Sequence, residues 1–315
     1  MRVLITGAAG NLGGFLAHDL VGRAHELRLM MHRTPVAGDL VDAPAIEVVR
    51  ADLARPESLP SCVADVDVIV HFAGVLFKPF PERFLPTTNL EYVLNLTRAA
   101  VEAGVRRVIL ISFPHVEGDT TPDAPAQGSL EGTPISVHAQ TRRAAEHALL
   151  DETRGSRTEV VILRSGLIYG RGVLMIEAAR WLMRRRWLGV WREPTWVHPL
   201  ALPDFLACVR AGIEKPALSG VYLLGDERPV TLQDFLDRLA RHWGFSRPWR
   251  APAFLFYLAG LACELWGVVW GTPSPLTRDF IRIGMVSHVG DTTRMRRELL
   301  PTLAYPTLED GLGLL

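Results

Sequence analysis

The stretch "TGAAGNLGG" (residues 6–14) decides the fold, because it places Gly7, Gly10 and Gly13 three residues apart directly after an apolar run. The run "RVLIT" (2–6) predicts a strand, and a helical pattern follows the glycines. Such glycines let the chain turn tightly, approach a phosphate and pack a helix against a strand, while N–H groups at the helix N-terminus attract the anion. The sequence therefore predicts a dinucleotide-binding turn, with contacts from Gly7, Gly10, Asn11, Leu12 and Gly13.

Apolar runs alternate with helical patterns through the first half of the chain. The runs are residues 2–6, 27–31, 67–74, 106–112 and 159–165, and the helical patterns between them include 11–22, 89–103 and 138–151. Strands that alternate with helices of this length imply a parallel sheet covered on both faces. We predict an α/β protein with a Rossmann-type doubly wound parallel sheet in residues 1–165. Residues 166–315 are expected to form a smaller, discontinuous, mainly helical substrate-binding domain, with segments near 190–210 returning to the first domain.

Composition excludes several classes of partner. The formal net charge is zero, so no overall field favours nucleic acid. Three cysteines, Cys62, Cys208 and Cys263, lie far apart without a CxxC pair, which fits neither a disulfide framework nor a metal site. The opening "MRVLIT" leaves no room for a secretory signal. We expect a cytoplasmic protein that binds no metal and no nucleic acid.

The glycine turn and several later stretches resemble the extended branch of the short-chain dehydrogenase/reductase superfamily, the NAD-dependent epimerase/dehydratase family. The stretches are "ADL" (51–53), "HFAG" (71–74), "RSGLIYGRG" (164–172) and a late strand and helix at 219–240. In the C-terminal part, "VGDTTRMRRELL" (289–300) is similar to the 3-beta-hydroxysteroid dehydrogenase-like branch. The resemblance implies an NAD(P)-dependent oxidoreductase-like enzyme. It also implies cofactor contacts from Asp52, Leu53, Phe72, Ala73 and Gly74.

The end of the second predicted strand bears on the choice of cofactor. Family members that use NAD place an acidic residue there, where it binds the adenine ribose hydroxyls. Here the stretch is "LMMHRT" (29–34), with Met31 at that position, followed by His32 and Arg33. A guanidinium suits the 2′-phosphate of NADP, because its fixed fork of donors matches a dianion. The sequence favours NADP, bound through His32 and Arg33, over the alternatives of NAD and of Arg33 as a solvated surface charge.

The catalytic positions depart from the family pattern of a tyrosine, a lysine four residues later and a nearby serine or threonine. Alignment on "RRAAEHAL" (142–149) places His138 at the tyrosine and Arg142 at the lysine. None of the five tyrosines precedes a lysine by four residues. Phe113 takes the hydroxyl position, with Ser112 one residue earlier. The resemblance therefore makes His138, Arg142 and Ser112 the catalytic candidates.

The substitutes still have useful chemistry. Arg142 stays cationic and can hold the nicotinamide ribose, so it is also a predicted cofactor contact. Its charge disfavours protonation of His138, and a neutral imidazole suits proton abstraction better than proton delivery. In the alternative interpretation, both side chains only pack against the cofactor. His115 and Glu117 are fallback acid–base candidates, and Asn89 is interpreted as structural support.

The second half of the chain differs in composition. All eight tryptophans lie after residue 180, so we predict an apolar, aromatic pocket for a hydrophobic small-molecule substrate. The run 251–270 is long enough to cross a membrane, but Glu264 interrupts it, which favours a pocket-lining or interface helix over peripheral membrane contact. Residues 184–186, three arginines, are interpreted as solvated, with an anion or lipid-headgroup patch as the alternative. A homodimer through helices 89–103 and 138–151 is left open.

Three functions are compatible with these features. The leading hypothesis is an NADP-preferring oxidoreductase that acts on a hydroxyl or keto group of an apolar metabolite, with His138 as base. The second is a protein that keeps the cofactor for sensing, structure or assembly, without redox turnover. The third keeps the fold and catalyses a non-redox isomerisation or cyclisation.

Overall fold

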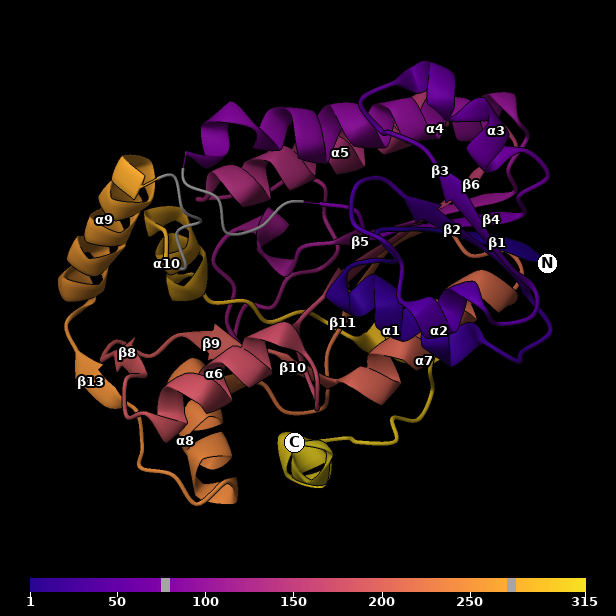
Figure 1. The fold of residues 1–315 in the computed structure, drawn as a ribbon. Helices are drawn as coiled ribbons and strands as arrows, with labels where there is room; N and C mark the ends of the chain where they lie inside the picture. The colour runs from indigo at the N-terminus through magenta and orange to yellow at the C-terminus, as the bar shows by residue number, and fades with distance from the viewer. Residues whose placement is uncertain (75–79, 271–275) are drawn as a thin grey trace.

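A seven-stranded parallel sheet forms the centre of the computed structural model, which describes residues 1–74, 80–270 and 276–315 (Figure 1). The strand order is β11-β6-β5-β4-β1-β2-β3, which confirms the predicted doubly wound α/β sheet. The strands are β1 (Arg2–Thr6), β2 (Glu26–Met31), β3 (Ile46–Arg50), β4 (Val68–His71), β5 (Arg107–Ser112), β6 (Glu159–Ser165) and β11 (Gly220–Leu224). The strand order changes direction between the neighbours β1 and β4, so a crevice forms beyond their carboxyl ends.

Helices cover both faces of the sheet (Figure 1). α1 (Asn11–Leu20) and α7 (Leu202–Glu214) pack on one face, and the short α2 (Gly38–Val41) lies between β2 and β3 in sequence. α3 (Pro60–Val63), α4 (Tyr92–Glu102) and α5 (Val137–Glu152) pack on the other face. Because α7 and β11 belong to this unit, the chain returns to it over residues 202–224, later than the predicted segment near 190–210.

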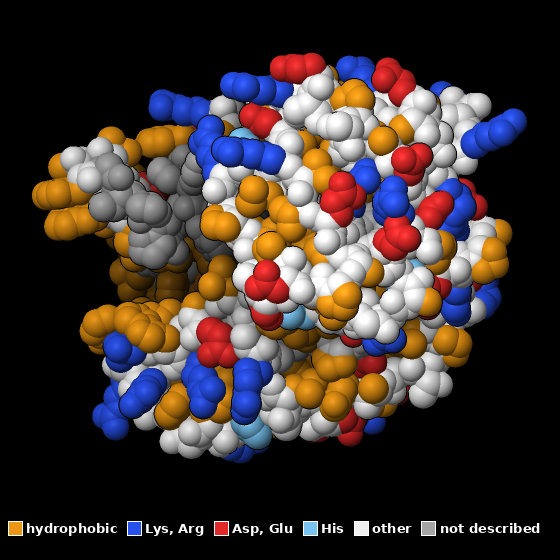
Figure 2. All heavy atoms as spheres, turned by 45° about the vertical axis from the view of Figure 1, so that its right-hand side comes forward, with side chains coloured by type: hydrophobic (Ala, Val, Ile, Leu, Met, Phe, Trp, Pro, Cys, Tyr) orange, Lys and Arg blue, Asp and Glu red, His pale blue; other side chains and the backbone are white. Residues whose placement is uncertain are grey.

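A smaller region follows the end of β6. Its helices are α6 (Leu174–Arg184), α8 (Leu232–His242), α9 (Ala253–Trp270), α10 (Arg278–Met285), α11 (Thr293–Glu298) and α12 (Leu308–Gly311). Its strands pair as β10 (Pro199–Ala201) with β7 (Leu167–Tyr169), β12 (Val230–Thr231) with β9 (Trp196–Val197), and β13 (Trp249–Ala251) with β8 (Gly189–Trp191). Hydrophobic side chains gather on the side of the surface where α9 lies (Figure 2).

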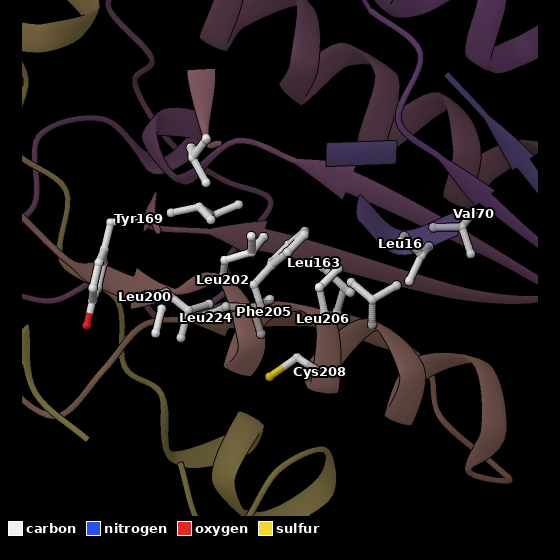
Figure 3. Packing of buried hydrophobic residues seen from close by; sticks show 14 of the residues in the cluster. Leu16, Val70, Leu163, Tyr169, Leu200, Leu202, Phe205, Leu206, Cys208 and Leu224 are labelled. Atoms are coloured by element: carbon white, nitrogen blue, oxygen red, sulfur yellow. The ribbon is translucent and has the colours of Figure 1, made fainter. Parts of the chain in front are cut away.

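The sheet is buried on both faces by separate apolar layers. Leu16 of α1 and Phe205 of α7 pack in one layer with Val70 of β4 (Figure 3). Ile69, the preceding residue of β4, packs instead with Leu96 of α4 in the other layer. Successive strand residues point to opposite faces, so a strand covered on both sides must be apolar throughout. This requirement explains the uninterrupted apolar runs of the sequence.

A buried ion pair attaches α5 to the sheet. Arg164 of β6 donates to Glu146 of α5 at 2.5 Å and to Glu117 at 2.6 Å, and the side chains of Arg164 and Glu146 are fully buried. The hydroxyl of Ser112, at the end of β5, also donates to Glu146. Ser136 caps the helix N-terminus by accepting from the N–H of Ala139 at 3.1 Å. These contacts fix where the first turns of α5 lie above the sheet.

Candidate active site

The predicted glycine turn has a geometry that larger residues would disrupt. Gly7 has a φ of +75°, and a Cβ added there would lie 2.9 Å from the backbone nitrogen of Ala73. A Cβ on Gly13 would collide with the carbonyl oxygen of Gly7. α1 begins without a side-chain cap at Gly10, which leaves its first N–H groups available to a ligand. The turn therefore has the close backbone approach and the free donors that a pyrophosphate requires.

The two other residues predicted in this turn have structural contacts. The amide of Asn11 donates to the carbonyl of Gly172 at 2.8 Å, and its oxygen accepts from the N–H of Leu174 at 2.9 Å. Leu12 is half-buried and packs against the core. Asn11 thus holds the segment after β7 beside the glycine turn, so only its backbone N–H is available for a ligand.

The residues after β2 and β3 form a polar edge beside the crevice. His32 Nε2 lies 3.3 Å from a carboxylate oxygen of Asp52, and Leu53 next to it is buried. Arg33 is exposed and makes no hydrogen bond or ion pair with any residue that the structure describes. Its guanidinium is therefore available to an anionic ligand at this edge.

The end of β4 faces a guanidinium that has no hydrogen-bond or ion-pair partner among the residues that the structure describes. A Cβ added to Gly74 would lie 2.7 Å from Nη2 of Arg142, so the two residues are in close contact beyond Phe72 and Ala73. Arg142 is only 8% exposed, and its Nη1 is buried without a hydrogen bond within the described part of the chain. Burial lowers the pKa of Arg142 to about 10, although Glu146 acts in the opposite direction. A buried charge of this kind needs a ligand with acceptor oxygens.

His71, the last residue of β4, is a polar group that sequence reasoning missed. Thr6 Oγ1 and His71 Nδ1 are 2.8 Å apart, while His71 Nε2 is buried without a described partner. Burial, and then the charge of Arg142, lower the pKa of His71 to about 3. Its only sequence signal was a polar residue inside the apolar run 67–74. His71 is neutral and adds another unpaired polar atom near Arg142.

The positions that the resemblance aligned with the catalytic residues do meet in space. The His138 ring lies 4.8 Å from the ring of Phe113, and the Phe113 ring lies 4.5 Å from that of His115. Burial lowers the pKa of His138 to about 3, and the charges of Arg142 and His115 add to this effect. His138 is therefore neutral, as predicted, but mainly because it is desolvated. The same burial makes it a weaker base than an ordinary histidine.

The remaining candidates are committed to structural contacts. The hydroxyl of Ser112 donates to the buried Glu146. His115 Nε2 contacts the carbonyl of Val286 at 3.1 Å, and burial lowers the pKa of His115 to about 4. Glu117 accepts from Arg164 and from the backbone N–H groups of residues 127 and 128. Asn89 donates to Thr141 of α5 at 2.9 Å, which fits the predicted supporting role.

A cavity of about 390 Å³ lies beside the N-terminus of α5. Val137, next to His138, lines it together with Phe80, Tyr257, Glu264 and Arg278. Asp279 of α10 also lines it and accepts a hydrogen bond from the N–H of Val137. Its described walls combine aromatic and charged side chains, and none of them is a tryptophan. The tryptophans that we expected in the pocket lie mainly elsewhere, with Trp187 and Trp266 exposed and Trp191 in the core.

Residues 3–184 match the model of the NAD-dependent epimerase/dehydratase family. The chain belongs to this family. It is an enzyme of the NAD-dependent oxidoreductase or epimerase kind, and its relatives include dehydrogenases and reductases. The 2-alkyl-3-oxoalkanoate reductase of Stenotrophomonas maltophilia is 26% identical over 88% of this chain and 87% of that protein. The ceramide reductase of Caulobacter vibrioides is 27% identical over 86% of this chain and 80% of its own.

Solved family structures share the fold. The UDP-glucuronic acid 4-epimerase of Bacillus cereus, in complex with NAD, superposes with a TM-score of 0.77 over 100% of this chain and 97% of that chain, at 18% identity. The 3-beta-hydroxysteroid dehydrogenase of Mycolicibacterium neoaurum is 27% identical over 54% of this chain and 48% of its own length. The superposition shows a shared fold, and the dehydrogenase is a relative of the kind that the sequence resembles.

Buried neutral histidines make the fold sensitive to acid. Burial lowers the pKa of His71, His115, His138, His198 and His288, four of them to about 3 or 4. Below pH 6.5 these histidines bind protons in the unfolded chain and not in the folded chain. Each of them therefore lowers the free energy of unfolding by up to about 1.4 kcal/mol for each unit by which the pH falls. The raised pKa values of Asp226, to about 7, and of Asp279 and His18 oppose this effect, but these groups are fewer than the five histidines. We predict that the free energy of unfolding, measured with urea, falls steeply between pH 6.5 and 4.5. Equal stability at both ends of this range would contradict the buried, neutral assignment.

Proposed function

We propose that the protein uses bound NAD(P) to interconvert a hydroxyl and a keto group on an apolar metabolite. The observation that carries the proposal is the guanidinium of Arg142 beside the end of β4, whose Nη1 is buried without a hydrogen bond to any described residue. The dinucleotide fits the residues present: N–H groups of the glycine turn would bind the pyrophosphate, and Arg142 would bind the nicotinamide ribose. When bound, the nicotinamide supplies or accepts the hydride. Two of the reductases that span most of this chain are named for a 2-alkyl-3-oxoalkanoate and for ceramide, which supports an apolar substrate.

We propose that His138, one helix turn before Arg142 in α5, contacts the oxygen of the substrate. A pKa of about 3 keeps its imidazole neutral, so one ring nitrogen can donate a hydrogen bond and the other can accept one. Protonation of this desolvated ring is unfavourable, so we propose that His138 mainly orients and polarises the substrate oxygen, and accepts its proton only during the reaction. Phe113 replaces the expected hydroxyl and keeps water away from one side of the ring.

A second candidate function rests on the same site. Phe113 offers no proton, the hydroxyl of Ser112 is bonded to Glu146, and burial disfavours the charged form of His138. These losses favour a family member that binds the cofactor tightly and no longer turns it over. No contact in the described part of the chain favours the non-redox isomerase or cyclase interpretation over these two.

The ligand role of Arg142 is tested by Arg142→Met, which removes the charge and keeps much of the volume. We expect NAD(P)H affinity to fall about 10- to 100-fold, the range for a lost charge-assisted hydrogen bond. The free energy of unfolding should not fall, because the guanidinium has no described protein partner to lose. Arg143→Met is the matched control, since Arg143 donates to the carbonyl of Gly132 and should affect stability and not cofactor affinity. Unchanged affinity with lowered stability would make Arg142 structural.

The role of His138 is tested by His138→Phe, with turnover followed by nicotinamide absorbance on a panel of hydrophobic ketones and secondary alcohols. We expect a loss of about 100-fold or more in kcat/KM with unchanged cofactor affinity. Wild-type kcat/KM should show no histidine ionisation between pH 5 and 8, because the pKa of His138 is about 3. His147→Phe, in the same helix, is the control. Tight cofactor binding without turnover of any substrate would favour the second candidate.

The preference for NADP is tested by Arg33→Ala. We propose that this exposed guanidinium contacts the 2′-phosphate, since no described residue competes for it and the position before His32 is Met31 instead of an acid. NADPH affinity should fall about 10-fold or more while NADH affinity stays within twofold. Arg154→Ala, an exposed arginine at the far end of α5, serves as the control. Equal losses for both cofactors, or none for NADPH, would refute this assignment.

A further inference from the structure

Helix α9 exposes an apolar surface that the proposed reaction does not explain. It is the one helix, among the residues that the structure describes, that is long and apolar enough to cross a membrane, yet only 17% of it is buried. Its buried residues are Gly260, Glu264 and Gly267, which face the rest of the protein. The exposed residues, from Phe254 to Trp270, cover an arc of about 200° at 100° per residue. That arc is about twice the width of the stripe that one partner helix covers.

Tryptophans extend this surface beyond the helix. The ring of Trp249 in β13 stacks on that of Phe256 at 5.4 Å, and its Nε1 donates to the carbonyl of Trp187 at 3.3 Å. Trp187 in turn contacts Trp181 of α6, with ring centroids 5.7 Å apart. The two segments join because β13 pairs with β8, which begins three residues after the arginines at 184–186. One continuous aromatic and aliphatic surface therefore runs from α6 to the end of α9.

A cationic patch borders this surface. Arg184, Arg185 and Arg186 are exposed, and none of them forms an ion pair within the described part of the chain. Arg185 lies over the ring of Trp181 at 3.9 Å. Figure 2 shows Lys and Arg side chains next to hydrophobic ones on this side of the molecule. Unpaired arginines next to exposed tryptophans suit the headgroup zone of an anionic bilayer, where indole and guanidinium groups are both stabilised.

We propose that α9, Trp187, Trp249 and residues 184–186 form a membrane-docking surface for an anionic lipid bilayer. α9 would lie along the bilayer surface and would not cross it. Glu264, near the middle of α9, accepts from Nε of Arg278 at 2.8 Å, and a Cβ on Gly260 would meet Ile281 of α10 at 2.7 Å. Crossing the bilayer would carry this ion pair and α10 into hydrocarbon, which is strongly unfavourable.

A second copy of the chain fits this surface less well. In a twofold dimer the patch would meet the same patch of the other copy, which offers the arginines at 184–186 apolar or cationic groups and no acidic partner. A facing helix would also leave a large part of the exposed arc of α9 uncovered. An anionic bilayer contacts the whole arc and attracts the arginines, so it accounts for both features.

The test is sedimentation of the full-length protein with vesicles of phosphatidylcholine alone or mixed with phosphatidylglycerol. We expect wild-type binding that is stronger on the anionic vesicles. The triple variant R184Q/R185Q/R186Q should lose on the order of a hundredfold in affinity for anionic vesicles and change little on neutral ones. Its control is R23Q/R154Q/R297Q, which removes three exposed arginines away from the surface and should keep most of the affinity.

The apolar contribution is tested by Leu258→Glu combined with Leu265→Glu, two exposed positions of α9. Binding to both kinds of vesicle should be lost, while Val41→Glu, an exposed apolar residue of α2, should bind normally. Circular dichroism and the Tm show whether each variant is folded. The proposal is overturned if wild type does not sediment with anionic vesicles, or if the α9 substitutions leave binding unchanged. It is also overturned if they abolish a dimer seen by analytical ultracentrifugation in a protein that binds no vesicles.

Discussion

The buried pair of Arg164 and Glu146 is the contact on which the candidate site depends. Glu146 follows His138 and Arg142 by eight and four residues, so the three side chains lie on one face of α5. Arg164 donates hydrogen bonds to both oxygens of Glu146, and Ser112 donates to one of them. Glu146 therefore makes no hydrogen bond with Arg142. The ion pair thus fixes the helix, while the guanidinium of Arg142 one turn earlier keeps a buried nitrogen without a hydrogen bond in the described part of the chain.

This arrangement separates two roles that the family pattern combines. The cation one turn after the catalytic position is kept as Arg142, buried beside Gly74. The proton-donating hydroxyls are absent, since Phe113 and His138 pack ring against ring where they were expected. In the proposed function such a site keeps a cation that would bind a ribose, while its acid–base chemistry would rest on one desolvated imidazole. Cofactor affinity and turnover should therefore respond to different substitutions.

Local patterns in the sequence predicted the fold, while contacts between distant segments could not be predicted. The glycine turn and five of the strands could be predicted because each pattern lies within a few consecutive residues. Strand β3, "IEVVR", was missed because this edge strand is only half-buried and mixes charged residues with apolar ones. The approach of His115 to His288, or of Asn11 to Gly172, joins residues more than 150 positions apart and leaves no local signal. The prediction that the tryptophans line the pocket was wrong for a related reason. Composition shows that these side chains are apolar, but it does not show whether each one faces the protein or the solvent.

The two faces of α9 connect the proposed surface to the proposed site. Tyr257 and Glu264 line the cavity beside Val137, whereas Leu258 and Leu265 point away from it and are exposed. A bilayer against the outer face would therefore lie one helix diameter from a cavity that reaches the residue before His138. The charged and aromatic walls of that cavity suit the polar end of an amphiphile, and the lipid phase suits its chain. If the chain of the substrate stays in the bilayer, the pocket itself does not need to be fully apolar. The polar cavity is then compatible with relatives named for a 2-alkyl-3-oxoalkanoate and for ceramide.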